Sequence, residues 1–487
     1  DAARETAQAM ILGDSSYLTI WVALRAGSVI FALPKNENMK DSIDFGSMEI
    51  PRLFRKLLIP TVLGMVFSAA FVITDGIFVG RGVGSDALAA VNITAPLFLI
   101  NTGVGLMFGV GASVVASIHL AHGKVKTARI NVTQAVVVSS LLLVAYSLAI
   151  CLFAPGAARL LGSSERLMPL VLEYMYWFVP FLPFSALLSS GMFFVRLDGA
   201  PGFAMACNIM AACINIALDY LFIFVFEWGL AGAAVATGIG YVVGSGVMLW
   251  YMFRRSRTLR FVKLKMSGKS MRLTVRNLWY MSYIGFPALL SELAISCLMI
   301  VGNYTFIRYV GKDGVAAYSI ACYIFPIIFM VYNGIIQSAQ PIISYNYGAG
   351  LMGRGRKALR MALGTATLCG LAAFGFTWLC SPWIVGLFLT PDAPAYAIAV
   401  QGLPWFAAGY PFFGINVVTI GYYQSIERGR LATGLTVLRG IVLMTFCFLL
   451  LPRIAGVTGI WLAVPAAEAL ETLLLVYLLR SRRFAFA

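Results

Sequence analysis

The sequence predicts an all-α integral membrane protein with twelve transmembrane helices, arranged as two parallel, pseudo-symmetric bundles of six. Of the 487 residues, 60% are hydrophobic and 11% are charged, which lies outside the range of a soluble globular domain. Apolar segments recur at the length of about 20 residues that a helix needs to cross a bilayer core. The second half of the chain also repeats the pattern of the first.

Twelve apolar segments follow residue 50. They are too long for the strands of a transmembrane barrel, which cross in about 10 residues. The segments cover residues 57–80, 87–110, 129–153, 168–194, 203–226, 230–253, 279–306, 315–338, 358–380, 396–423, 431–451 and 456–479.

The formal net charge of +16 has an uneven distribution along the chain. If the first helix starts in the cytoplasm, 25 lysines and arginines lie on the inner side and 6 on the outer side. This bias follows the positive-inside rule, so we expect both ends of the twelve-helix body in the cytoplasm. The basic residues therefore indicate topology, and we expect no nucleic-acid partner.

An internal repeat relates the two halves. VGSDALAAVNIT (83–94) aligns with VGKDGVAAYSIA (310–321), and GLAG (229–232) aligns with GVTG (456–459), both at an offset of 227 residues. Because six helices is an even number, both halves enter the membrane from the same side and the repeat is parallel. Two similar bundles tethered on one side can rock against each other, which makes a transporter the first hypothesis.

The repeat also predicts the domain organisation. We expect an N-lobe over residues 48–253, a basic linker over 254–278 and a C-lobe over 279–487. The linker carries nine positive charges and no acid, a composition suited to the cytoplasmic surface beside anionic lipid.

Residues 1–47 are predicted to be an N-terminal extension. Its apolar segment, Tyr17–Pro34, is short and interrupted by Arg25. A thirteenth membrane segment, a processed signal and an upstream region wrongly joined to the gene are all open. We favour the last, with Met39 as the expected start.

Six acids lie within the predicted spans: Asp75, Glu173, Asp219, Glu292, Glu468 and Glu471. Glu173 lies near a helix end and Glu471 about two turns from the inner boundary, so we expect both to reach water. Asp75, Asp219 and Glu292 lie in the outer half of the bilayer at comparable heights, roughly 20 to 27 Å from the inner helix ends. An uncompensated carboxylate there costs at least ~2.5 kcal/mol, so each should face the bundle interior or a wet cavity.

The fifth helix carries a polar stripe of Asn208, Asn215 and Asp219, which lie within about 40° of one another on a helical projection. Thr237 in the sixth helix comes to a similar depth, so we expect Asp75, Asn215, Asp219 and Thr237 to converge. Two adjacent carboxylates in an apolar bundle cannot both ionise easily, so the pair could take up a proton or bind Na⁺.

The repeat provides an internal comparison for this cluster. Its counterparts in the second half, residues 302–303 and 447–448, carry no acid. This favours a functional role for Asp75 and Asp219 over an architectural one. The alternative is that Asp219 only bonds Asn215 or a carbonyl between helices.

The sequence offers no enzyme constellation. The eight cysteines fall within or at the ends of apolar segments without CxxC spacing, and the two histidines have no nearby acid or cysteine partner. We therefore expect no catalytic residues, no cofactor and no metal other than the coupling ion, H⁺ or Na⁺.

At three places the chain resembles a known family: DGIFVGRGVGSDALAAVNITAP (75–96), NIALDYLFIF (215–224) and GIIQSAQPIISYNYGAG (334–350). These segments are similar to the multidrug and toxic compound extrusion (MATE) family, of MATE/MOP-type fold, and especially to its MepA-like bacterial branch. The resemblance covers the chain from about Asp41 to the C-terminus. It implies efflux of organic, typically cationic, compounds by antiport with H⁺ or Na⁺, by a monomer in the bacterial cytoplasmic (inner) membrane.

The resemblance also implies roles for single residues. Asp75, Asn215, Asp219 and Thr237 match the family's N-lobe cation site. Glu292 resembles an acid that some members carry in helix seven. Those members have a second acid in helix ten, whereas YPFFGINVV (410–418) has none and places Phe413 near that position. A complete C-lobe Na⁺ site is therefore not expected.

Other polar residues of the spans are candidates for the substrate cavity. Arg439 stands alone in its span and is expected either to pair with Glu292 or to extend to the inner surface. The alternative function is a lipid-linked oligosaccharide flippase of the same superfamily, which would need an extended cationic cavity. The cavity candidates are Asn208, Glu292, Asn303, Asn333, Gln337, Gln340 and Arg439.

Overall fold

The computed structural model describes residues 43–265 and 267–480, and all its regular elements are helical. The predicted apolar segment Tyr17–Pro34 and the expected start at Met39 lie outside these residues. Residues 43–47, which were assigned to the extension, pack into the protein: Phe45 is buried and its ring lies 5.8 Å from that of Tyr345. These residues therefore contact the C-terminal half of the chain before the first helix begins.

The first half of the chain forms a bundle that we call the first bundle. Its elements are α3 (Ile50–Gly82), α4 (Ser85–Ala121), α5 (Val125–Leu152), α6 (Ala154–Leu160), α7 (Met168–Phe178), η1 (Val179–Phe181), α8 (Leu182–Leu197), α9 (Pro201–Asp219), η2 (Tyr220–Val225), α10 (Gly229–Trp250) and η3 (Tyr251–Arg255).

The second half forms the second bundle. Its elements are α11 (Gly268–Tyr309), α12 (Lys312–Gly348), α13 (Met352–Gly386), α14 (Pro394–Ala407), α15 (Tyr410–Ser425), α16 (Gly429–Val437), η4 (Leu438–Leu443), α17 (Met444–Trp461) and α18 (Ala463–Arg480). Because α11 begins at Gly268, the last part of the predicted linker is helical, and only residues 256–267 join the bundles.

The helices agree with the twelve predicted segments. In the described residues, ten helices or continuous helical runs are long and apolar enough to span a membrane, and α14 with α15 forms an eleventh that bends by 43°. Helix α17 is interrupted at Ala455 and Gly456, which have non-helical backbone angles. Its last turn and α18 make up the twelfth segment.

The turns repeat with the sequence. Gly84 and Gly311, 227 residues apart, both have a positive φ (120° and 85°), and so do Gly123 and Gly350 (70° and 71°). Only glycine adopts such angles without strain, so equivalent turns require equivalent glycines. The internal repeat is therefore present in the backbone as well as in the sequence.

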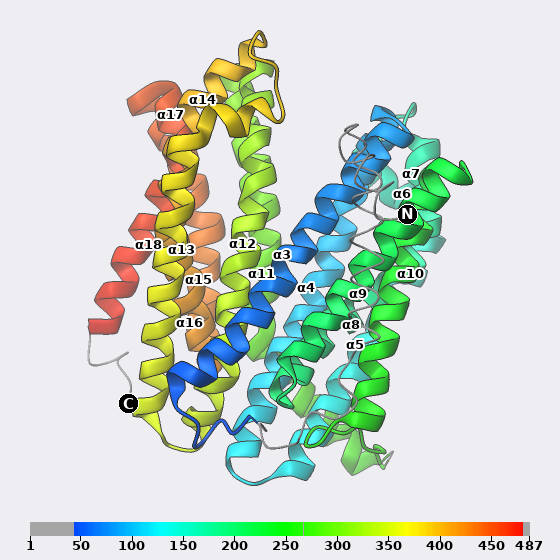
Figure 1. The fold of residues 1–487 in the computed structure, drawn as a ribbon, viewed down its shortest axis with the longest axis vertical. Helices are drawn as coiled ribbons and strands as arrows, with labels where there is room; N and C mark the ends of the chain where they lie inside the picture. The colour runs from blue at the N-terminus through cyan, green and yellow to red at the C-terminus, as the bar shows by residue number, and fades with distance from the viewer. Residues whose placement is uncertain (1–42, 266, 481–487) are drawn as a thin grey trace, which may run out of the picture.

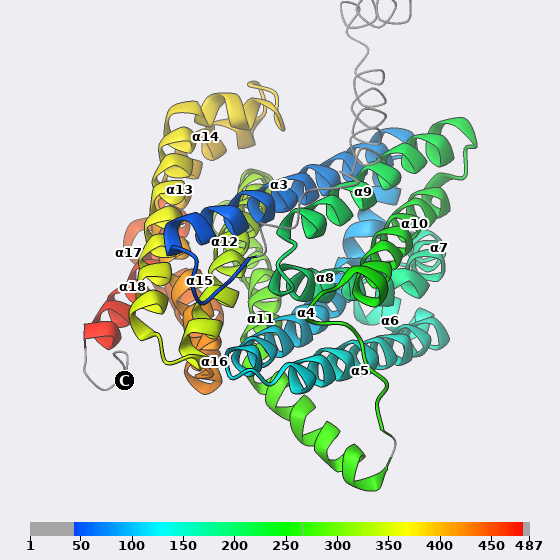
Figure 2. The same ribbon diagram turned by 60° about the horizontal axis from the view of Figure 1, so that its bottom comes forward.

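The two bundles lie side by side and diverge toward one end (Figure 1, Figure 2). At the other end they share one hydrophobic core, whereas a second core cluster, around Val79, Tyr174 and Leu230, belongs to the first bundle alone. Helices α4 and α11 pack closely where they cross. A Cβ at Gly111 would collide with the Met281 carbonyl, and one at Gly285 with that of Met107. Glycine therefore permits this tight contact between the bundles.

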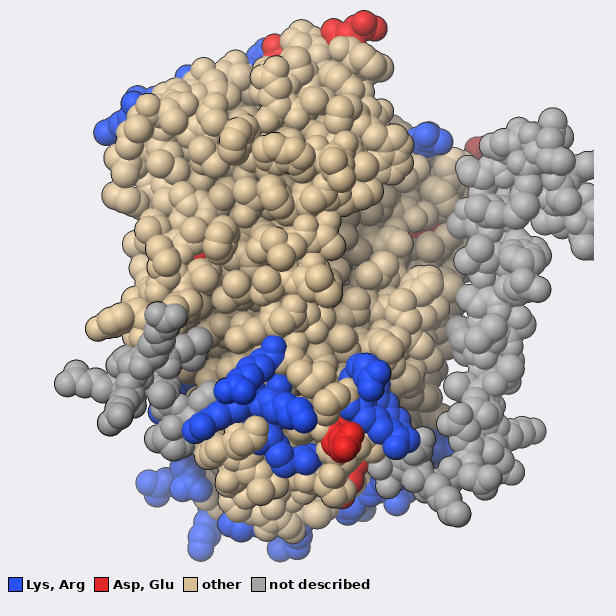
Figure 3. Space-filling model, turned by 60° about the vertical axis from the view of Figure 1, so that its left-hand side comes forward, with Lys and Arg blue, Asp and Glu red and all other residues tan. Residues whose placement is uncertain are grey.

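Hydrogen bonds also join the bundles at the end where they meet. Gln134 donates to Thr274 Oγ1 (2.7 Å), Ser117 Oγ donates to the Pro341 carbonyl (3.3 Å) and Asn346 donates to the Phe45 carbonyl (3.1 Å). We call this the basic end, because the connections 122–124, 256–267, 349–351 and 426–428 lie there with most of the lysines and arginines. On the face shown in Figure 3, basic side chains gather at this end and the broad middle is almost free of charge.

Asp198 fixes the linker to the basic end of the first bundle. Its carboxylate accepts hydrogen bonds from the backbone N–H groups of Arg257 (3.0 Å), Thr258 (2.7 Å) and Leu259 (2.8 Å), and from the Tyr251 hydroxyl (2.8 Å). Residues 257–259 of the linker are therefore held against the first bundle.

Candidate functional site

Four predicted residues meet inside the first bundle. Helix α3 carries Asp75, α9 carries Asn215 and ends at Asp219, and α10 carries Thr237. Asp219, Asn215 and Thr237 are buried, with 0%, 1% and 6% of their surface exposed, and Asp75 is half-buried. The structure thus brings the four residues together, as the depth and stripe of the sequence predict.

The polar contacts of this cluster are incomplete. Asn215 Nδ2 donates to Thr237 Oγ1 at 3.0 Å. The carboxyl groups of Asp75 and Asp219 are direct neighbours, and Asn215 lies beside Asp219. Yet Asp75 Oδ1, both Asp219 oxygens and Asn215 Oδ1 are buried without a well-formed hydrogen bond among the described residues. The cluster therefore contains more oxygen acceptors than its donors satisfy.

Such a set fits a small cation. A proton on one carboxyl would turn that group into a donor for its neighbour and halve the buried charge. Na⁺ would be held by the carboxylate, amide and hydroxyl oxygens, the ligand type that hard cations prefer. Asp75, Asn215, Asp219 and Thr237 are the residues that would hold it.

Two tyrosines, which the sequence reading missed, adjoin the cluster. Tyr174 of α7 lies within electrostatic range of both carboxyls, and Tyr241 of α10 lies within range of Asp75. Tyr241 follows Thr237 by four residues and so shares its helix face, a spacing that could have identified it.

Glu173, another acid of the predicted spans, makes a different contact. It accepts a hydrogen bond from the Ala231 backbone N–H (3.3 Å) and caps α10.

A cavity between the bundles collects most of the other predicted residues. Glu292 of α11, Asn333, Gln337 and Gln340 of α12, and Arg439 of η4 line it, together with apolar residues such as Phe193 and Phe329. Asn208 and Asn303 do not line it. Asn208 lies beside Gly64 of α3, and Asn303 is exposed.

Arg196 also reaches the space between the bundles. Arg196 is one of the 25 basic residues that the charge distribution places on the inner side. Its side chain is 3% exposed, and Nη1 donates to Gln337 Oε1. This bond joins α8 to α12 beside the cavity. A basic residue close to a helix end gave no sequence signal that distinguished it from a surface arginine.

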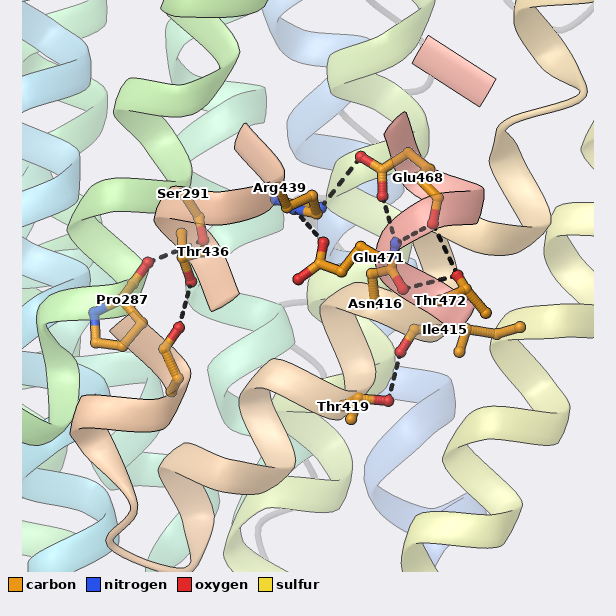
Figure 4. Close-up of polar contacts among 11 residues, drawn as sticks. Pro287, Ser291, Ile415, Asn416, Thr419, Thr436, Arg439, Glu468, Glu471 and Thr472 are labelled. Carbon is orange, nitrogen blue, oxygen red and sulfur yellow. Dashed lines mark hydrogen bonds and ion pairs between the residues drawn. The ribbon is translucent and has the colours of Figure 1, made fainter. Parts of the chain in front are cut away.

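Arg439 corrects two expectations. Its side chain is 4% exposed, so it does not extend to the surface, and its ion-pair partners are Glu468 (3.7 Å) and Glu471 (3.8 Å) rather than Glu292. Glu471 does not reach water, because its side chain is fully buried against Arg439. The guanidinium also lies 4.9 Å from the ring centre of Phe413 (Figure 4 shows the polar partners).

A match to a family model shows which protein family the chain belongs to. A family model described as MatE matches residues 60–221 and again residues 287–449, about two thirds of the chain in all. This chain belongs to the MATE family. The two matches begin 227 residues apart, the offset at which the sequence and the turns repeat.

Curated MATE relatives are similar over most of the chain. The chain is 28% identical to the multidrug export protein MepA of Staphylococcus aureus strain N315 over 434 residues, which cover 87% of the chain and 93% of that protein. It is 27% identical to MepA of Staphylococcus saprophyticus over 429 residues, with the same coverage.

Solved structures of MATE proteins share the fold. One, described as the outward-facing conformation of a multidrug resistance MATE family transporter, superposes with a TM-score of 0.83 at 22% identity, covering 90% of this chain and 97% of that one. A transporter of the same superfamily from Pyrococcus furiosus gives a TM-score of 0.82 at 21% identity with the same coverage. The chain is thus a multi-pass membrane protein with the twelve-helix MATE fold.

Proposed function

We propose that the protein is a multidrug efflux transporter that exports organic, typically cationic, compounds by antiport with H⁺ or Na⁺. The observation that carries the proposal is the pair of adjacent carboxylates, Asp75 and Asp219, in which three of the four oxygens are buried without a well-formed hydrogen bond among the described residues. A carboxylate without a partner in a membrane span lowers the stability of the protein. A chain that retains two of them therefore indicates a function for their charge. The names of the MepA relatives support the drug substrate.

The arrangement of the bundles supports alternating access. The bundles are closed at the basic end by the α4–α11 crossing and by bonds such as Arg196 to Gln337, and they diverge at the other end (Figure 1). By the positive-inside rule the basic end faces the cytoplasm, so this state is outward-open. We place the protein in the bacterial inner membrane as a monomer, with the N-lobe, linker and C-lobe of the sequence prediction as its moving parts.

The coupling step follows from the cation site. When Asp75 and Asp219 take up a cation from the outside, the buried charge of the pair is halved and α3 can pack more closely on α9. That change in packing would bias the first bundle toward the inward-open state, in which the cation leaves and a drug enters. Glu292 supplies the negative charge of the cavity for a cationic substrate. The same charge opposes the pyrophosphate of a lipid-linked oligosaccharide, and we do not propose a flippase or an enzyme.

Efflux assays test this function. Cells that lack their own multidrug pumps and express the chain should extrude ethidium, and inverted vesicles should accumulate it when a pH or Na⁺ gradient is imposed. The gradient that drives accumulation identifies the ion. Accumulation that needs neither gradient would contradict antiport, and no extrusion of ethidium or other organic cations would contradict multidrug efflux.

A further inference from the structure

The second bundle contains its own buried charge cluster. Arg439 lies in the π-helical turn η4, and Glu468 and Glu471 lie one turn apart on α18. The three side chains are 4%, 1% and 0% exposed. Figure 4 shows the two carboxylates directed at the one guanidinium. A π-helical turn in the middle of a span is often found at a functional site.

The cluster does not balance its charges. Two carboxylates face one guanidinium, so one negative charge is left over in a site without exposed surface. The ion pairs, at 3.7 and 3.8 Å, are too long for hydrogen bonds. Both oxygens of Glu471 and Oε1 of Glu468 consequently lack a hydrogen-bond donor. A surplus buried charge of this kind costs several kcal/mol unless a cation neutralises it.

The two glutamates differ in their surroundings. Asn416 Nδ2 donates to Glu468 Oε2 at 2.7 Å and to the Glu468 carbonyl at 2.9 Å, and Thr472 holds the Asn416 amide by donating to its Oδ1 at 2.8 Å. These bonds stabilise the charged form of Glu468. Glu471 receives no such bond, so the surplus charge is least stabilised there.

We propose that Glu471 is a second protonation site, which gives the C-terminal half its own proton-coupled step. The proposal rests on the proposed transport function and deepens it. A proton is favoured over Na⁺ because it sits on one carboxyl oxygen, whereas Na⁺ would have to lie beside the guanidinium, a like charge that is within 4 Å of both carboxylates.

Other titratable groups surround α18 in the described residues, but only Arg439 is within ion-pair distance of the glutamates. Tyr332 is near enough to Glu468 to sense its charge, and its hydroxyl is engaged by the Tyr410 carbonyl at 2.7 Å. The titratable side chains on the elements packed against α18 are Arg439 of η4, Cys447 and Arg453 of α17, Tyr396 of α14, and Tyr410, Tyr422 and Tyr423 of α15.

Arg439 connects this site to the substrate cavity. It lines the cavity together with Glu292, and it lines an adjoining smaller cavity together with Glu468. Glu471 lines neither cavity but pairs with Arg439, so its protonation leaves the charge of Arg439 less compensated and makes the surroundings of the cavity more positive by one unit. A cationic substrate should bind more weakly in that state, by about tenfold for one charge at this range.

Binding of tetraphenylphosphonium, a permanently charged organic cation, tests the proposal. Purified full-length protein in lipid nanodiscs is titrated between pH 5 and pH 9 in sodium-free buffer. The background variant carries Asp75→Asn, Asp219→Asn and Glu292→Gln, which removes titration of the first cluster and of the carboxyl that lines the cavity. We expect its affinity to fall about tenfold from pH 8 to pH 5. Adding Glu471→Gln should make the affinity independent of pH and as weak as that of the background at pH 5.

Two controls separate protonation from a structural role. Glu173→Gln, which keeps the oxygen that caps α10, should leave the pH profile of the background unchanged. Glu471→Gln leaves a balanced pair, Arg439 with Glu468, so the thermal unfolding temperature should be equal to or above that of the parent. A clear decrease in that temperature would mean that Glu471 is structural and would overturn the proposal.

The outcomes also separate this proposal from the transport function. A pH profile that survives Glu471→Gln overturns the second site while leaving efflux intact. Binding that responds to Na⁺ at constant pH and is lost with Glu471→Gln overturns the proton assignment. Failure of the unmodified protein to bind or export any organic cation overturns the transport function itself.

Discussion

Each bundle contains a buried polar cluster. The two clusters consist of similar groups, and the second has one additional residue. The first has two carboxylates, Asp75 and Asp219, with a bonded amide and hydroxyl, Asn215 and Thr237. The second also has two carboxylates, and its bonded amide and hydroxyl are Asn416 and Thr472. Only the second adds a buried cation, Arg439.

This difference teaches how each cluster can respond to an ion. Without a guanidinium, the first cluster must obtain all of its neutralising charge from solution, so it is the stronger candidate for coupling. In the second, Arg439 supplies one of the two charges and leaves one to be supplied. The clusters also lie on different helices of the repeat, so they are not copies of each other.

The largest expected effect is on transport by the first cluster. Asp219→Asn removes the charge that a coupling cation would neutralise, so gradient-driven ethidium efflux should fall to the background of cells without the protein. Asp75→Asn should act in the same direction. Because neither change strands an opposite charge, neither should lower the thermal unfolding temperature in detergent.

Asp86→Asn is the matched control for these variants. Asp86 lies in the same bundle and pairs with Arg166 at 2.7 Å, but its side chain is 49% exposed, and such surface pairs contribute about 0 to 1 kcal/mol. Its efflux should equal that of the unmodified protein. Full efflux by both Asp75→Asn and Asp219→Asn would remove the coupling role.

The next largest effect is on stability in the second bundle. Arg439→Gln removes the one basic side chain that, among the described residues, lies within ion-pair distance of Glu468 and Glu471, and it leaves two buried carboxylates unpaired. The unfolding free energy should fall by roughly 3 kcal/mol, measured by chemical or thermal unfolding in detergent. The triple change Arg439→Gln, Glu468→Gln and Glu471→Gln should recover most of the loss. An Arg439→Gln protein as stable as its parent would show that the bundles do not differ in this way.

The sequence predicted the first cluster but not the second, and the reason is physical. Asp75 and Asp219 are found from depth and helical periodicity alone, because each lies deep in an apolar span. The internal repeat does not predict the second cluster. The repeat equivalents of Asp75 and Asp219 are not acidic, and the acids of this bundle lie on α18 instead. The expectation that Glu471 reaches water was wrong, although it lies about two turns from the inner boundary. The rotation of a helix about its axis also decides whether a side chain faces water.

A local signal for the second cluster was nevertheless present. Glu468, Glu471 and Thr472 have the spacing i, i+3, i+4, which places them on one helix face. Arg439, alone in an apolar span, requires an opposite charge. Together these features indicate an ion-pair network between the last two spans.

The bend between α14 and α15 falls at Ala408 and Gly409, just before Pro411, so the sequence carries a local helix-breaking signal there. The π-helical turns have no such signal, and no period in the sequence specifies them.

The smallest expected effect compares the two hydroxyls. In the first bundle Thr237 accepts the bond from Asn215, whereas in the second Thr472 donates to Asn416. Thr237→Val removes the acceptor of the Asn215 amide, which can turn to the adjacent Asp219 carboxylate, so it should reduce the apparent affinity for the coupling ion with little loss of stability. Thr472→Val loosens Asn416, which bonds a charged Glu468, and should instead lower the unfolding free energy by about 1 kcal/mol. Serine at either position keeps the hydroxyl and should behave as the parent, so equal effects of the two valine variants on ion affinity would mean that both bundles bind the coupling ion alike.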